Sequence, residues 1–545
     1  MQHSYKTREN REKAAVELFQ RAKDARSEKE RGWTKFSDYY EGKHRTPALE
    51  GMGFMPACCT DVYLHVETQV DPKIPACTFY GRDSDMDNRR AKQRQYVVEY
   101  ILENNKLEAQ NSRNERRLLK YGSAFWKCFY DENMPSSIGG RGDIRIIDVP
   151  VESLFPDPAN RSSDINDCEY VDYVYYIHRR KAERLYGGRI RGMSLENMGG
   201  GEREDDLFAP LGTAETDETI RVLEHWYRDE DGDIACSVLL GETEVQHIPK
   251  YWENTRGQNK NYPFVHYWRI ANENEFWQRS EVEQIIDLVD AVDRELAIAL
   301  YNDAMTSSDM FLVEEDALAD GQELTNMPGS VLKLKPGQSG RVQRLLGAHT
   351  GIHCMPMISA LQEQIARTVG NFDATQGSEP LRVTTASGIA QLNERADARR
   401  SLKRADRLDG FKRLYQLCDW SALEFYDDGR LIRLGTPDDG SGGYFMFDPT
   451  EHRMLAGGMR DIDGEVISES KSYFPIVDVV VAAGDGIAKS TSFTVSVLEK
   501  LATMPVTAEN YKLLCAFVEM VDIPQAAELA EFWRNMYERP AAVNE

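Results

Sequence analysis

The chain has 545 residues, with 66 lysines and arginines against 90 aspartates and glutamates, so its formal net charge at pH 7 is −24. A hydrophobic content of 41% and a charged content of 29% are ordinary for a globular protein. This length could fill about three to four average domains. Proteins that grip DNA usually carry a basic footprint, because each neutralised phosphate releases counterions. Charge alone therefore favours a soluble acidic protein with no nucleic-acid partner.

Several classes of protein do not fit the sequence. No uncharged apolar run approaches the ~18 residues that suggest a membrane span, and the start, Met1 to Lys6, lacks the apolar core of a secretory signal. Nine cysteines, an odd number without metal-ligand spacing, indicate reduced and mostly buried thiols in a protein made in a cytoplasm. Cys58 and Cys59 are the only close pair, and adjacent cysteines rarely bridge. We expect no catalytic residues, no cofactor and no metal.

In the first half, residues 5–40 and 86–120 are predicted helices. The second ends in a basic cluster, for which a salt-bridged or solvated helix face is favoured over contact with DNA or a partner: Arg113, Arg116, Arg117 and Lys120. Strands are predicted at 124–130, 143–149 and 170–178, the last with alternating Val and Tyr. Arg141-Gly142-Asp143 is expected in the Gly-rich turn between the first two strands, as a hairpin connection rather than a cell-adhesion motif. Residues 187–218 have little periodicity and are expected to form a surface loop, followed by a hairpin at 219–227 and 233–240.

The most informative stretch runs from Arg279 to Phe372 and is predicted to form a helix, a turn-rich insert and a second helix. Ser280 and Glu283 form a Ser-x-x-Glu capping box at the helix start. Apolar residues then recur at steps of three and four, which is typical of a helix packed on neighbouring helices. They are Val282, Ile285, Val289, Val292, Leu296 and Ala299. The acidic residues between them would repel a polyanion.

The order of several motifs resembles the portal (head-to-tail connector) proteins of tailed bacteriophages. The motifs, which span roughly residues 30 to 500, are Trp33-x-x-Phe36-x-x-Tyr39-Tyr40-Glu41-Gly42 (an early helix end), Leu118 to Lys127 (a helix-to-strand step), Asp148-Val149-Pro150 followed by Phe155-Pro156-Asp157-Pro158 (the wing sheet), Pro263 to Trp268 (the entry to the stem) and Thr385 to Ala390 (the start of a long helix). No single motif is highly specific; the resemblance depends on their order. It is weakest near 187–218, 435–470 and the last forty or so residues.

The resemblance implies an α+β fold with a mixed α/β wing, a two-helix stem, a small α/β clip and a helical C-terminal crown. The expected parts are a first wing segment at 1–278, stem helices at 279–307 and 349–372, and the clip at 308–348. A tunnel loop at 373–387, a long helix with the rest of the wing at 388–485, and the crown at 486–545 complete the chain. In the clip, short strands at 311–313 and 331–335 and a turn at 336–340 precede 341–346. Their exposed edges could pair with the next subunit.

The resemblance also implies a non-enzymatic ring, most often of twelve subunits, at the portal vertex of the virion between capsid and tail. Such a ring, assembled in the host cytoplasm, passes double-stranded DNA during packaging and ejection and nucleates procapsid assembly. Its partners would be the terminase large subunit, the major capsid and scaffolding proteins, and a head-completion or adaptor protein; no membrane is involved. An acidic passage would let DNA slide, because contact with it is weak.

Three sets of residues are candidates for these roles. The expected channel lining of the first stem helix is Glu281, Glu283, Asp287, Asp290, Asp293 and Glu295. The expected tunnel-loop contacts to DNA are Gln376, Arg382, Thr384 and Thr385, with Arg382 the only basic residue of that loop. The expected clip residues for partner docking are Glu314, Glu315, Lys333, Lys335, Arg341 and Arg344. An ordinary connection with a solvated Arg382 is the alternative for the loop.

Residues 387–426 form the longest helical pattern, with Gly410 as a plausible bend. Its first half is basic and is expected to pair with the acidic stem or wing of a neighbouring subunit in preference to DNA: Arg395, Arg399, Arg400, Lys403, Arg404 and Arg407. A strand at 476–482 follows. Helices at 490–504, 507–521 and 524–537 would form the crown, with Pro524 at a first helical position.

Two enzyme-like features and one structural alternative stay open. Residues 479–491 mimic a strand, a Gly-bearing loop and a helix with Lys489-Ser490, but Ala483 and Ala488 occupy the places where a phosphate-binding loop needs glycine. A nucleotide-dependent enzyme around Lys489 is therefore disfavoured. His349 and His353 have the spacing of one helix face and could hold a metal, although a surface or packing role is favoured. A tail-adaptor ring that never meets a packaging motor is the structural alternative.

Overall fold

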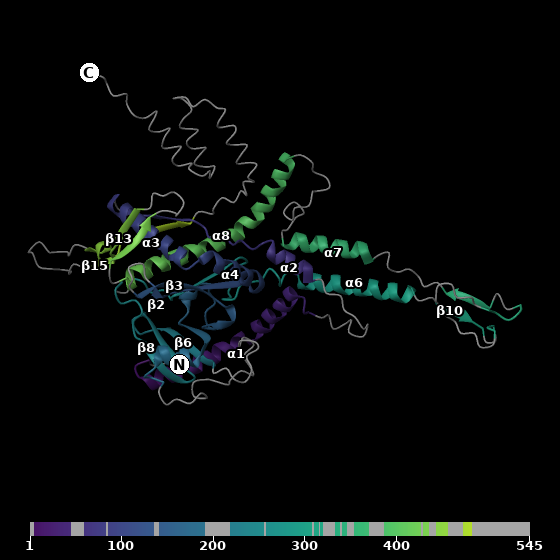
Figure 1. The fold of residues 1–545 in the computed structure, drawn as a ribbon, viewed down its shortest axis with the longest axis horizontal. Coiled ribbons are helices and arrows are strands. Elements are labelled where there is room, and N and C mark those ends of the chain that lie inside the picture. The colour runs from purple at the N-terminus through teal and green to yellow at the C-terminus, as the bar shows by residue number, and fades with distance from the viewer. Residues whose placement is uncertain are drawn as a thin grey trace, which may run out of the picture. The chain divides into compact units, whose positions relative to one another are not determined.

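The computed structural model describes residues 5–44, 59–82, 85–135, 141–190, 219–255, 258–307, 310–314, 317–319, 333–337, 341–345, 354–369, 386–426, 429–434, 443–455 and 472–481 (Figure 1). The chain divides into two compact units, Met1–Val481 and Ala482–Glu545, and the second lies outside the described residues. The described part is mixed α/β, and its strand pairs are antiparallel. This confirms the α+β class.

Helix α1 (Arg8–Glu41) confirms the first predicted helix. The Thr7 side chain accepts a hydrogen bond from the Asn10 amide at its start. At its end Gly42 takes the left-handed conformation, with φ of 69°, and the Lys43 amide donates to the Asp38 carbonyl at 2.8 Å. The Tyr-Tyr-x-Gly motif is therefore a helix end, as the sequence indicated. Helix α2 (Cys59–Glu67) follows.

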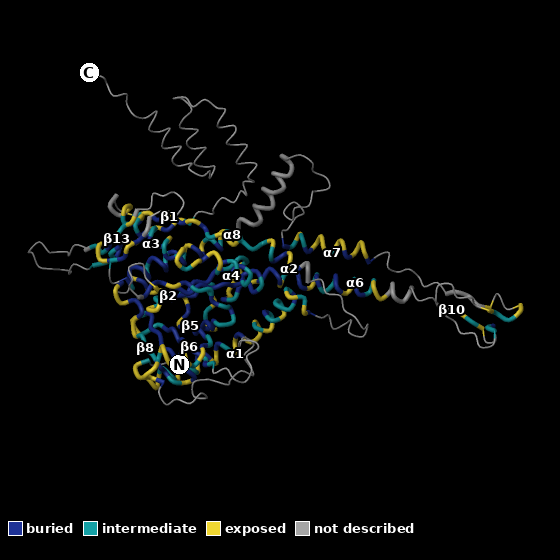
Figure 2. Tube along the Cα trace, viewed as in Figure 1, coloured by how far each residue is buried: buried dark blue, intermediate teal, exposed yellow. Residues whose placement is uncertain are grey.

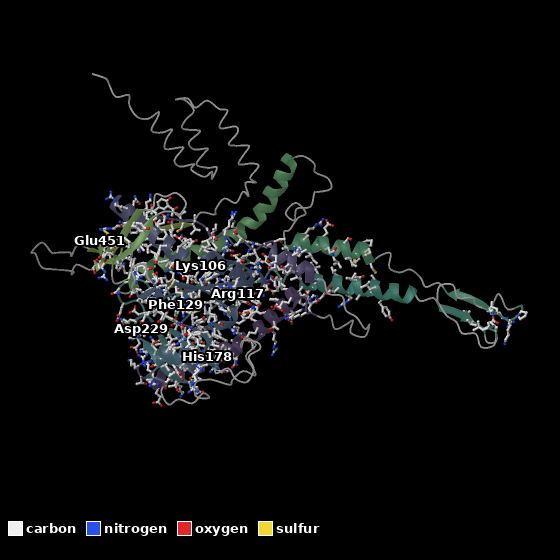
Figure 3. All side chains as sticks on the ribbon, viewed as in Figure 1. Lys106, Arg117, Phe129, His178, Asp229 and Glu451 are labelled. Carbon is white, nitrogen blue, oxygen red and sulfur yellow. The ribbon has the colours of Figure 1, made fainter. Side chains whose placement is uncertain are left out.

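The second predicted helix is two helices, α3 (Asp85–Asn104) and α4 (Leu107–Tyr121). Lys106 breaks the chain between them, with φ of 48° in the left-handed region. The Asn105 side chain supports the break, because its amide donates to the Ile101 and Ile144 carbonyls at 2.8 and 2.9 Å. The prediction of one continuous helix over 86–120 was wrong, since no glycine or proline marks this position. Lys106 is labelled in Figure 3.

The helix-to-strand step after α4 has the form that the sequence predicted. Gly122 ends α4 with φ of 82°, and β2 (Ser123–Pro135) begins at the next residue. A Cβ at Gly122 would lie 2.3 Å from the Gln278 carbonyl oxygen, so the segment before the acidic helix fits closely against this turn. Strand β2 lies between β3 (Arg141–Val149) and β9 (Phe264–Trp268).

Arg141-Gly142-Asp143 begins strand β3 and is not in the turn, so its placement in the hairpin connection was wrong. Asp143 is fully buried. Its carboxylate accepts hydrogen bonds from the Tyr100, Asn104 and Tyr426 side chains at 2.9, 3.1 and 2.6 Å. The aspartate is committed to the core, and an adhesion receptor could not reach it.

A five-stranded sheet carries the other half of this region. Its order is β4 (Leu154–Pro156), β5 (Tyr170–His178), β6 (Thr219–Arg228), β7 (Ile234–Leu240) and β8 (Thr243–Ile248). The predicted strand 170–178 and the predicted hairpin are confirmed. At the open edge of β8, the Glu12 carboxylate accepts from the Glu244 amide at 2.8 Å, and Arg8 donates to the Glu244 carbonyl at 2.7 Å. Short helix α5 (Arg179–Tyr186) follows β5, and residues 191–218 of the expected loop lie outside the described residues.

Helix α8 (Ala386–Phe425) confirms the long predicted helix and runs through the main core. At Gly410 an added Cβ would lie 2.2 Å from the Tyr267 Cβ, so this glycine lets α8 approach strand β9 closely. The buried Arg94 guanidinium of α3 donates to the Asp419 carboxylate of α8, with Nε 2.7 Å from Oδ1. Figure 2 shows the buried residues of this region in dark blue.

The remaining elements are short strands and the two predicted stem helices. Strand β1 (Cys77–Tyr80) pairs with β16 (Asp478–Val481), β12 (Arg430–Leu434) with β13 (Gly443–Phe447), and β14 (Met454–Leu455) with β15 (Ser472–Tyr473). Helices α6 (Ile286–Ser307) and α7 (Cys354–Val369) pack on each other and flank the β10 (Met310–Val313) and β11 (Val342–Leu345) pair in sequence. Tyr39 of α1, Val62 and Val66 of α2, and Leu119 of α4 share a second core with them.

Candidate functional site

The predicted capping box is present in the turns that lead into the acidic helix. The Ser280 hydroxyl oxygen accepts from the Val282 and Glu283 amides at 2.9 and 3.3 Å, and the Glu283 carboxylate accepts from the Ser280 amide at 3.4 Å. The same hydroxyl lies 2.5 Å from the Lys120 carbonyl at the end of α4. Residues 281–285 form turns, so the regular helix begins at Ile286, later than the sequence suggested. The box fixes the start of the stem to the end of α4.

The six predicted channel acids differ in their exposure on this chain. Glu283 and Asp287 are exposed, and Glu295 is half-buried. The opposite face of α6 carries the apolar residues of the second core, and the Ile358, Ile365 and Val369 side chains of α7 complete it. An acidic outer face and an apolar inner face are therefore present on one helix. A channel-lining role stays a prediction for these three residues.

The other three acids are engaged within the chain. Glu281 is buried, and its Oε1 lies 2.6 Å from Lys403 Nζ of α8. Asp290 accepts a hydrogen bond from the Tyr39 hydroxyl. Asp293 is fully buried, with Oδ2 2.8 Å from His44 Nε2. Sequence reasoning missed these contacts, because Tyr39 and His44 are some 250 residues away in the chain.

Tyr39 has a raised pKa, because it is buried and because its hydroxyl is bonded to Asp290. It therefore remains a protonated donor at neutral pH. The Tyr39 ring also stacks on the His44 ring, with 4.1 Å between centroids and 11° between planes. Tyr39 of α1 and His44, which follows the end of that helix, thus form one unit against α6.

The basic cluster on α4 is engaged in salt bridges, as predicted. Arg113 and Arg117 lie 2.7 and 2.5 Å from Asp148, and Arg116 lies 2.7 Å from Glu67. The Lys120 ammonium lies over the Tyr40 and Tyr121 rings at 5.0 Å. Arg117 is labelled in Figure 3. These contacts leave the cluster with protein partners rather than an open phosphate-binding face.

The basic half of α8 pairs within the same chain. Besides Lys403, the buried Arg407 guanidinium lies 2.7 Å from Glu115 of α4 and 3.2 Å from Asp71. The carboxyl of Glu115, which is fully buried, has a raised pKa because desolvation outweighs the nearby positive charges. The side chains of Arg395, Arg399 and Arg400 lie outside the described residues. The sequence predicted that these basic residues pair with the acidic stem or wing of a neighbouring subunit. Lys403 instead pairs with Glu281 of its own chain.

The clip candidates are only partly described. Glu314 and Arg341 form an exposed ion pair at 3.1 Å, and the chain pairs here as β10 and β11. Lys333 is exposed and Lys335 is half-buried, while Arg344 lies on β11 opposite Phe311. Glu315 and the side chain of Arg344 are outside the described residues. Exposed ion pairs of this kind contribute ~0–1 kcal/mol, so the pair leaves these charges available to a partner.

Several predicted features fall outside the described residues. They are the tunnel-loop residues Gln376, Arg382, Thr384 and Thr385, the histidines His349 and His353, the Lys489 segment from 482 onward, and the expected crown helices. Among the residues that are described, no group of three or more His, Cys, Asp or Glu could hold a metal ion. Six cysteines in this part are free and buried: Cys77, Cys128, Cys168, Cys236, Cys354 and Cys418.

A cleft of about 1080 Å³ is lined by residues of β2, β6 and β7, among them Phe129. Phe129 is labelled in Figure 3. Its floor holds the Lys127 ammonium, 2.5 Å from the Glu224 carboxylate, and the Trp226 indole donates to the same carboxylate at 2.9 Å. The ammonium also lies 4.6 Å from the centre of the Tyr173 ring. Because these charged groups already have partners, the cleft floor supports the sheet and offers no reactive group.

These elements define a mixed α/β protein in which the acidic helix α6 packs on the helix α7. A family comparison is consistent with this, because residues 73–545 match the model of the phage P22-like portal protein. The chain belongs to that family, which is structural rather than enzymatic. No curated protein matches the chain. Within the described residues, no helix is both long and apolar enough to cross a membrane.

Proposed function

We propose that the protein is the portal subunit of a tailed bacteriophage and forms a ring at one vertex of the capsid. The ring is the conduit through which double-stranded DNA enters during packaging and leaves during ejection. The observation that carries this proposal is the family match over residues 73–545. The exposed residues Glu283 and Asp287 support it, because a negatively charged lining repels phosphates and keeps contact with DNA weak.

The parts of the chain take the roles that the sequence indicated. Residues 1–278 and 388–485 form the wing, 279–307 and 349–372 the stem, 308–348 the clip, 373–387 the tunnel loop and 486–545 the crown. The long α6 and α7 pair and the short β10 and β11 pair between them support the stem and clip assignment. In this scheme the clip docks the terminase large subunit and later the head-completion or adaptor protein. The wing and crown meet the capsid and scaffolding proteins, and assembly takes place in the host cytoplasm before the ring enters the virion.

The test is the oligomeric state of the purified full chain. Negative-stain images should show rings with a central hole, and native mass spectrometry should give a closed oligomer, most often of twelve subunits. A ring of thirteen would also support the proposal, because closure rather than the exact count defines a conduit. A stable monomer at micromolar concentration in moderate salt would contradict it.

The same preparation separates the conduit from the nucleotide-dependent alternative. A portal needs no ATP of its own, so the purified ring should show no magnesium-dependent ATP turnover. Turnover that disappears in the Lys489→Ala variant would favour the enzyme and overturn the conduit-only function.

A further inference from the structure

Helix α1 contributes to a different core near each of its ends, and its Trp33 packs in the main core. Near its start, Ala15, Leu18 and Phe19 pack on the five-stranded sheet, in one core with Val174 and Leu223. Near its end, Tyr39 packs in the second core, with apolar residues of α6 and α7. A helix of 34 residues is ~51 Å long at 1.5 Å per residue, so α1 is long enough to reach from one of these cores to the other. The helix can be followed in Figure 1 from the N-terminal label towards α2 and α6.

Ion pairs and hydrogen bonds hold α1 to the sheet region at several points. Arg11 donates twice to the Glu244 carboxylate of β8, at 2.8 Å each. The buried Arg26 guanidinium donates to the Val151 and Leu154 carbonyls beside β4, at 3.3 and 2.5 Å. Contacts of this number along one helix leave it little freedom to slide or rotate on the sheet.

At the other end, the turn at Gly42 brings His44 back against Tyr39. The two side chains reach two carboxylates one helical turn apart on α6, Asp290 and Asp293. The His44 and Asp293 side chains are only 3% and 1% exposed, so water contributes little to their solvation. A buried carboxylate that loses a hydrogen-bond donor keeps its desolvation cost. A shift of α6 that separated Asp293 from His44 would therefore be unfavourable, so the contact favours one position of the helix.

We propose that α1 is a strut that sets the position of α6, and that Tyr39 and His44 are its positioning residues. By engaging Asp290 and Asp293 they fix the rotation of α6 about its own axis, which keeps Glu283 and Asp287 outward. The effect of this strut on DNA passage rests on the proposed function, because a fixed acidic face matters only if the protein is a conduit. Residues 1–72 precede the family match, so the match itself does not assign this role.

Hydrogen exchange on the full-length protein tests the strut. In His44→Ala, amides of 286–300 should exchange about tenfold faster or more, because a hydrogen bond to a charged group is lost, while those of β5 should not change. His44→Gln retains an N–H donor and should restore most of the protection. Tyr39→Phe should affect the same α6 peptides to a smaller extent.

Tyr40→Phe is the matched control. It removes the same hydroxyl from the next residue of α1, but the Tyr40 hydroxyl donates to Glu67 of α2 at 2.7 Å. It should therefore affect peptides of 59–67 and leave 286–300 unchanged. Equal effects of Tyr39→Phe and Tyr40→Phe on α6 would overturn the proposal, as would unchanged α6 exchange in His44→Ala.

A double variant gives an independent check. His44→Ala leaves Asp293 buried without this donor, so adding Asp293→Ala should reverse part of the loss of protection rather than add to it. Simple additivity of the two changes would contradict direct coupling. In particles, packaged DNA should fall in His44→Ala and recover in His44→Gln. If exchange behaves as expected but wild-type rings pass no DNA, the strut stands and the conduit function fails.

Discussion

The surroundings of single residues in this protein depend on contacts that helical or strand periodicity in the sequence does not reveal. Gly410 has a sequence context that suggests a bend, yet its distinguishing contact is the approach of α8 to the Tyr267 side chain. Asp143 belongs to a motif known for exposed loops, yet it accepts three side-chain hydrogen bonds in the core. In each case the partner comes from a distant part of the chain.

Gly410→Ala should destabilise the wild-type fold by about 1–3 kcal/mol, because the new methyl would lie 2.2 Å from the Tyr267 Cβ. The higher helix propensity of alanine would offset up to about 1 kcal/mol of this. Denaturant unfolding checks the prediction. Gly188→Ala is the control, since a Cβ there has no neighbour within 4 Å and should change little. A neutral Gly410→Ala would mean that α8 and β9 can separate without cost.

At the scale of the elements, sequence periodicity predicted the regular helices and strands well, but it missed the place where a helix is interrupted. Strand β5 matches its predicted range, and α1 and α8 lie within a few residues of theirs, because alternation and helical spacing are local properties. The break at Lys106 was missed, because a left-handed lysine held by a neighbouring asparagine carries no glycine or proline signal. The acidic residues of the candidate stem could be recognised from their residue type. Their contacts with Tyr39, His44 and Lys403 could not, because these contacts form when remote segments of the chain pack together.

The joint between α1 and β8 should be sensitive to acid. Burial of Glu244 acts to raise its pKa, but the hydrogen bonds and charge of Arg11 outweigh burial, and the pKa is lowered below its usual value. A carboxylate with a lowered pKa contributes stability above its unfolded pKa, and that contribution is lost as pH falls through the folded pKa. Wild-type protein should therefore lose this contribution below about pH 4.5.

Glu244→Gln measures that contribution. At pH 7 it should cost about 1.5–3 kcal/mol, the range for hydrogen bonds to a charged group, and the difference from wild type should shrink as the pH is lowered to 3. Chemical denaturation at several pH values checks this, with exposed Glu9→Gln of the same helix as the control. A difference that stays constant with pH would mean that the carboxylate charge is not what stabilises the joint.

For the molecule as a whole, charge is the dominant property. Each copy carries a formal charge of −24, and copies brought together in a ring repel one another. Many basic side chains already pair within the chain, as Arg113, Lys403 and Arg407 do, so they are less available to neutralise a neighbouring copy. Ring closure must then depend on apolar contact and on screening by ions.

The fraction of protein in rings should therefore rise between 50 mM and 500 mM NaCl, because added salt screens the repulsion between copies. The screening length is about 10 Å at 0.1 M salt and about 3 Å at 1 M. Sedimentation velocity at a fixed protein concentration checks this, with sucrose of equal osmolality as the control for non-ionic effects. A ring fraction that falls with salt would indicate that opposite charges hold the interface together.

The capped edge of β8 has a practical consequence for shortened versions of the chain. Arg8 and Glu12 occupy the backbone carbonyl and amide of Glu244 that would otherwise face outward. Without α1, this strand would offer free main-chain groups to any other extended segment, which is the usual starting point of aggregation. A product trimmed to the family-matched region should thus be poorly soluble when expressed, even though most of its own core is retained.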